Sequence, residues 1–71
     1  MENIQVSVNK LLNHGKLLET IRSTDAQKEY MHYLYNDRFY RVCKNISGEI
    51  IFAVRIKRDY LSDGAKYHIN H

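Results

Sequence analysis

The chain has 71 residues, with 11 Lys and Arg against 8 Asp and Glu, a net charge of +3, and one cysteine. A chain of this length forms one small domain and buries only about 60% of the surface that its unfolded form exposes, so its core stabilises weakly. A single cysteine excludes an intramolecular disulfide framework. No apolar run approaches a membrane span or a signal-peptide core, so we expect a cytoplasmic protein with residues 1–71 in a single domain.

Residues 1–15 are expected to form a short helix. Apolar residues recur at helical spacing at Ile4, Val8, Leu11 and Leu12. Gly15 would end this helix by adopting the left-handed conformation. The alternation of Ile4, Val6 and Val8 keeps a second prediction open, an extended segment followed by a shorter helix from Ser7 to His14. In either case Leu11 and Leu12 need to be buried.

Residues 16–57 are expected to form an antiparallel sheet. The β-branched residues Thr20, Ile21 and Thr24 favour a first strand over an extension of the helix, and residues 24–27 make the loop back. Two further turns follow, one at Asn36-Asp37 and one at Asn45-Ile46-Ser47-Gly48, where Gly48 supplies a positive φ. The sequence therefore predicts an α+β fold with a short N-terminal helix packed on a four-stranded antiparallel β-meander.

The two turns also predict which side chains share a face of the sheet. The first turn places Tyr33 opposite Tyr40, and the second places Val42 opposite Phe52. The predicted core face consists of Met31, Tyr33, Tyr40, Val42, Phe52, Val54 and Ile56. The opposite face then carries Tyr30, His32, Leu34, Phe39, Arg41, Cys43, Ile51, Ala53 and Arg55.

Residues 58–71 are expected to be a partly mobile C-terminal tail, because chain ends of this polarity are commonly loose. Within it, Tyr60 and Leu61 can pack back on the edge of the sheet.

Catalysis is not expected. The sequence has no glycine-rich phosphate loop, no nucleophile elbow and no paired carboxylates. Cys43 and His32 share a predicted face with Arg41, but Cys43 is interpreted as a small apolar filler rather than an activated thiol. His14, His32, His68 and His71 lack the cysteine partners of structural zinc sites, so we expect no metal and no cofactor.

The mixed apolar and basic face is the candidate binding surface. Its predicted contact residues are Tyr30, His32, Leu34, Phe39, Arg41, Ile51 and Arg55. Aromatic residues and arginine are enriched in protein interfaces, which favours a protein partner or a second copy of the chain in a homodimer. Rings and cations on one sheet face also suit single-stranded nucleic acid, which is the alternative.

Overall fold

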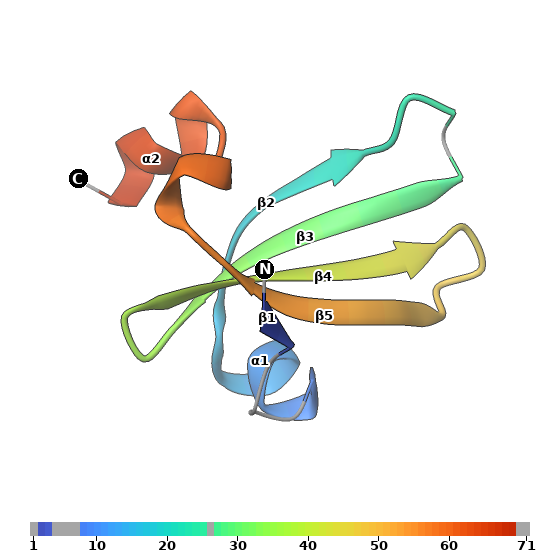
Figure 1. Cartoon of the computed structure of the whole chain (residues 1–71), viewed down its shortest axis with the longest axis horizontal. Coiled ribbons are helices and arrows are strands. Elements are labelled where there is room, and N and C mark those ends of the chain that lie inside the picture. The colour runs from blue at the N-terminus through green and yellow to red at the C-terminus, as the bar shows by residue number, and fades with distance from the viewer. Residues whose placement is uncertain (1, 4–7, 26, 70–71) are drawn as a thin grey trace.

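The computed structural model describes residues 2–3, 8–25 and 27–69. In chain order the elements are β1 (Glu2–Asn3), α1 (Val8–His14), β2 (Lys16–Arg22), β3 (Lys28–Tyr35), β4 (Arg38–Asn45), β5 (Ile50–Ile56), the 3-10 helix η1 (Arg58–Tyr60) and α2 (Asp63–Ile69). The strands form one antiparallel sheet in the order β1-β5-β4-β3-β2 (Figure 1). The predicted α+β meander is confirmed, and β1 adds a short fifth strand beside β5.

Helix α1 is the shorter of the two predicted alternatives. It begins at Val8, whereas Ile4 and Ser7, the predicted first residue of the shorter helix, lie outside the described residues. Leu11 is fully buried, but Leu12 is 40% exposed, so only one of the two leucines enters the core. None of the helices in the part of the chain that the structure describes is long and apolar enough to cross a membrane.

Gly15 ends α1 for a different reason from the one predicted. Its φ is not positive, and its N–H donates to the Leu11 carbonyl at 2.9 Å. A Cβ at this position would lie 2.6 Å from the Leu11 oxygen and 3.2 Å from Cδ1 of Tyr33. The glycine is therefore required by close packing between the helix end and β3.

Both predicted hairpin turns are present. Asn36 and Asp37 have φ values of 52° and 61°, which is the conformation of a two-residue turn that matches the twist of the strands. In the second turn the Asn45 side chain accepts hydrogen bonds from the N–H groups of Ser47 and Glu49, and Gly48 has a φ of 91°. The first turn produces the predicted register between β3 and β4, including Tyr33 opposite Tyr40 and Met31 opposite Val42.

The predicted register between β4 and β5 is correct only next to the turn. Lys44 lies opposite Ile50 as expected, but an irregularity follows, and Cys43 then lies opposite Phe52. Ile51 is the extra residue of this β-bulge, which shifts every later pair by one position. Because a shift by one exchanges the two faces, Phe52, Val54 and Ile56 leave the predicted core face, and Ala53 and Arg55 join it.

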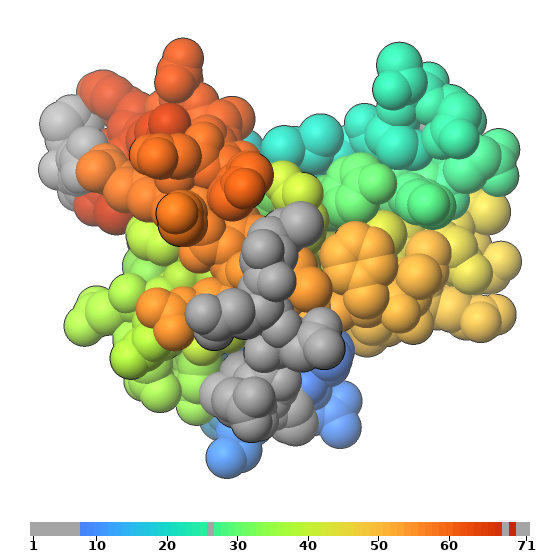
Figure 2. Space-filling view, in the orientation of Figure 1, coloured from blue at the N-terminus to red at the C-terminus, as the bar shows by residue number. Residues whose placement is uncertain are grey.

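The sheet has a small core on each face. On the first, the α1 face, Leu11 packs with Met31, Tyr33, Tyr40 and Val42. On the second, the α2 face, Ile56 packs with Leu61 and Ala65, against which Leu18, Phe39, Val54 and Ile69 are partly buried. In Figure 2 the C-terminal segment, orange to red, forms a lobe at one end of the sheet. This segment covers part of the α2 face, which corresponds to the mixed apolar and basic face predicted from the sequence.

The C-terminal segment therefore contains ordered elements where we expected a tail. Leu61 and Ala65 are buried, Ile69 is half-buried, and the three are spaced four residues apart, as on one side of a helix. Ser62 caps the helix, since its hydroxyl accepts a hydrogen bond from the Ala65 N–H at 3.2 Å. Tyr60 remains half exposed beside this segment.

The different space around Gly15 and Gly64 leads to a testable prediction. We expect Gly15→Ala to destabilise the protein by about 1–3 kcal/mol, because the new methyl group meets the rigid backbone oxygen of Leu11. In a domain of this size that loss lowers the melting temperature by about 4–8 °C per kcal/mol. Gly64→Ala is the matched control, since a Cβ there meets only the Ser62 hydroxyl at 3.9 Å. Thermal melts in which both variants are equally destabilised would contradict the close-packing account.

Candidate partner-binding site

Three rows of side chains on the α2 face run across the strands, and a further pair, Lys28 and Asn45, lies beyond them. The row under the C-terminal segment contains Leu34, Phe39 and Ile56, and the middle row contains Glu19, His32, Arg41 and Val54. We name the third row the open row: Ile21, Tyr30, Cys43 and Phe52. The rows follow from the strand registers, because residues directly opposite one another point to the same face.

The middle row is a hydrogen-bonded chain. Nδ1 of His32 lies 2.6 Å from Oε2 of Glu19, and Nε of Arg41 donates to Nε2 of His32 at 3.0 Å. Since the arginine can only donate, Nε2 of His32 accepts, and the proton on Nδ1 is donated to Glu19. The imidazole is fully buried, and both of its nitrogens have partners.

Glu19 connects this chain to the C-terminal segment. Its Oε2 accepts a hydrogen bond from the Ser62 N–H at 3.1 Å, and its Oε1 accepts one from the Ser62 hydroxyl. Burial opposes ionisation of the carboxyl, but the bonds from Ser62 and the contact with His32 outweigh it and hold the pKa of Glu19 below its ordinary value of 4.5. A β-bulge between Leu17 and Glu19 in β2 aligns Glu19 with His32.

Arg41 is held on several sides. Its guanidinium carbon lies 5.3 Å from the centre of the Tyr30 ring and 5.8 Å from that of Tyr60, within the range of cation–π attraction. The side chain is therefore half-buried between a strand residue and an η1 residue. Arg41 was predicted as a contact residue of the binding face, whereas in the structure its side chain also holds His32 and two aromatic rings within the fold.

The seven predicted contact residues do not all meet. Tyr30, His32, Leu34, Phe39 and Arg41 share the α2 face, as expected. Arg55 lies opposite Tyr40 on the α1 face, and Ile51 is the bulge residue, so both placements were wrong. His32 has no exposed surface and can only position Arg41, while Phe39 packs against the C-terminal core.

The open row supplies exposed apolar residues that the sequence analysis missed. Ile21 and Phe52 are each 39% exposed, at opposite ends of a row whose centre is the fully buried Cys43. Ile21 was missed because the register of β2 depends on its bulge, and Phe52 because of the bulge in β5. A strand rich in apolar residues on both faces, such as Ile50–Ile56, is the only sequence signal for such a surface.

The described His and Cys side chains of the α2 face are not arranged as a metal site or as a reactive thiol. Among the described residues, no group of three or more His, Cys, Asp or Glu side chains is placed to hold a metal ion. Cys43 is fully buried, and the nitrogens of His32 are engaged by Glu19 and Arg41.

The lowered pKa of Glu19 predicts a pH-dependent contribution to stability. A carboxyl whose folded pKa lies below its unfolded value stabilises the fold above the unfolded value, and this stabilisation is lost as pH falls through the folded pKa. We expect Glu19→Gln to destabilise by about 1–2 kcal/mol near pH 7, because the bonds to a charged group are weakened. The difference from the native chain should stay constant above about pH 5 and shrink below about pH 4.5.

Urea unfolding across this pH range measures the effect. Glu49→Gln, at an exposed position after the β4–β5 turn, is the matched control and should change stability little at any pH. A Glu19→Gln penalty that persists undiminished at pH 3 would contradict the role assigned to the ionised carboxylate.

Comparison with known proteins finds no match to this chain. No family model, no curated protein and no solved structure matches it. The chemistry of its own residues is therefore the basis for a functional proposal.

Proposed function

We propose that the protein is a small, non-enzymatic binding protein that acts as a homodimer and uses the open row as its contact surface. The observation that carries the proposal is the exposure of Ile21 and Phe52, which lie on the same face at the two ends of one row. Exposed apolar side chains gathered on one face, rather than scattered singly, are typical of interaction sites.

The composition of the open row favours a second copy of the chain as its occupant. The row itself contains no Lys, Arg, Asp or Glu, so two copies can bring these four side chains together without a like-charged pair among them. A symmetric dimer places the same patch on both subunits and buries both sets of apolar side chains at once. For a chain of 71 residues with two small cores, such a contact adds the apolar burial that the monomer lacks.

Pairing of sheet edges is the less suitable route to a dimer. The edge strand β2 has a bulge between Leu17 and Glu19, and Glu19 is engaged by Ser62 of the C-terminal segment. Bulges and covering segments are devices that protect an edge strand from pairing with another chain. We therefore assign the contact to the face of the sheet.

Two features support the non-enzymatic and cytoplasmic parts of the proposal. His32, the buried member of the middle row, uses both nitrogens in structural hydrogen bonds and leaves none for proton transfer. The single, buried cysteine suits a reducing compartment such as the cytoplasm, where disulfides are rare.

Two exposed apolar residues of β2 provide a matched test. Ile21 belongs to the open row, while Leu17 is 49% exposed but lies opposite Tyr33 on the α1 face. We expect Ile21→Asp to weaken dimerisation at least ten-fold, because the symmetric contact contains the buried charge twice. Leu17→Asp should leave the dimer unchanged.

Sedimentation equilibrium over a wide range of protein concentrations measures both variants, and circular dichroism verifies that they are folded. A native protein that remains a folded monomer at every concentration would overturn the homodimer. Equal loss of dimer in the two variants would show that the contact is not the open row.

A further inference from the structure

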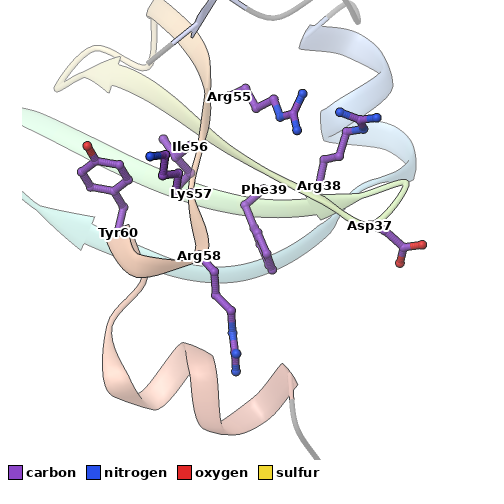
Figure 3. A pocket seen from close by; sticks show the side chains of 8 residues that line it. All are labelled: Asp37, Arg38, Phe39, Arg55, Ile56, Lys57, Arg58 and Tyr60. Atoms are coloured by element: carbon purple, nitrogen blue, oxygen red, sulfur yellow. The ribbon is translucent and has the colours of Figure 1, made fainter.

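A basic hollow lies where β4 begins and β5 ends, separate from the open row. Its volume is about 530 Å³, and it is lined by Asp37, Arg38, Phe39, Arg55, Ile56, Lys57, Arg58 and Tyr60 (Figure 3). The residues come from the β3–β4 turn, the end of β5 and η1. Figure 3 shows Arg38 and Arg55 extending from the strands on the side of α1, whereas Arg58 extends toward α2.

The hollow contains the whole charge imbalance of the chain. It has four of the 11 Lys and Arg residues and one of the 8 Asp and Glu residues, which leaves seven of each elsewhere. Outside the hollow the chain is therefore formally neutral. Charge gathered in one concave place concentrates the electrostatic potential there and attracts an anionic ligand.

Three of the cations are available to such a ligand. Arg38, Arg55 and Lys57 are exposed, and no Asp or Glu of residues 8–25 and 27–69 forms an ion pair with their side chains. Glu2 of β1 lies opposite Arg55 in the strand register. Guanidinium groups bind phosphate with two parallel hydrogen bonds, which makes arginine well suited to a phosphate backbone.

An aromatic ring lies at the same site. Tyr60 lines the hollow and is 50% exposed, and the guanidinium of Arg41 is 5.8 Å from its ring centre. Phe39, the other aromatic lining residue, packs against the C-terminal core. Tyr60 is thus the ring on which an unpaired base can stack. It contacts Arg41 of the α2 face, whereas Arg38 and Arg55 extend on the side of α1, so a strand that uses both the ring and these cations crosses the end of β5.

We propose that the basic hollow binds single-stranded nucleic acid, with Arg38, Arg55 and Lys57 on the phosphates and a base stacked on Tyr60. The volume lies within the roughly 300–1,000 Å³ range of small-ligand sites, so it admits part of an unpaired strand. A duplex, with its bases stacked inside, would not reach the ring. The proposal does not depend on the homodimer, because the hollow lies outside the open row.

The test is binding of a fluorescent oligodeoxythymidine to the full chain, followed by anisotropy. With about three phosphate contacts the salt slope for a single strand is about −2.1, so affinity should fall roughly twenty-fold between about 50 and 200 mM salt. Arg38→Gln and Lys57→Gln should each reduce the slope by about 0.7. Lys28→Gln, an exposed lysine at the start of β3, is the matched control and should leave the slope unchanged.

Two further variants separate the roles of charge and ring. Asp37→Asn removes the only carboxylate of the hollow at a positive-φ position that Asn tolerates, so it should tighten binding several-fold. Tyr60→Leu should weaken binding about ten-fold without changing the salt slope, whereas Tyr60→Phe should retain it. Thermal melts verify that each variant is folded.

Three results of these binding experiments would contradict the proposed site or its ligand. No binding at about 50 mM salt would remove the site. An equal effect of Lys28→Gln and Lys57→Gln would show attraction by net charge alone. Binding of duplex DNA or of polyglutamate as tight as that of oligodeoxythymidine would overturn single-stranded nucleic acid as the ligand.

Discussion

The hydrogen-bonded chain that runs from Ser62 through Glu19 and His32 to Arg41 is the constraint on which the rest of the structure depends. It crosses β2, β3 and β4 and connects them to the residue that caps α2. Such a chain is stable only when it is complete, because a buried polar atom without a partner costs about 1–3 kcal/mol. In the part of the chain that the structure describes, no buried side-chain nitrogen or oxygen lacks a partner.

The hydrogen-bonded chain from Ser62 to Arg41 divides the α2 face into two surfaces with different properties. On one side, Leu61 and Ala65 cover Ile56 and half-buried Phe39, and η1 borders the basic hollow. On the other side, the open row remains exposed at Ile21 and Phe52. Arg41 belongs to the boundary, because it donates to His32 and contacts the rings of Tyr30 and Tyr60. The position of the C-terminal segment thus determines which part of the α2 face stays exposed.

Local turn chemistry made much of the fold predictable. Asn36-Asp37 and Asn45–Gly48 each have residues suited to their backbone conformation, so the meander and the β3–β4 register follow from sequence. The bulges at Leu18 and Ile51 could not be predicted in this way, since they depend on packing between faces rather than on the residues of a turn. Because the bulge at Ile51 was not predicted, the predicted β4–β5 register put Arg55 on the α2 face and Phe52 on the α1 face, the reverse of what the structure shows. The C-terminal helix had a signal that was not used, the cap at Ser62 with Leu61, Ala65 and Ile69 at helical spacing.

A double-mutant cycle between Glu19 and Ser62 measures whether the Glu19 carboxylate holds the C-terminal segment on the sheet. Urea unfolding of Glu19→Ala, Ser62→Ala and the double variant gives the coupling energy, and loss of the α2 cap in Ser62→Ala cancels in the cycle. The account predicts a favourable coupling of at least about 1 kcal/mol. Effects that add to within about 0.3 kcal/mol would contradict it.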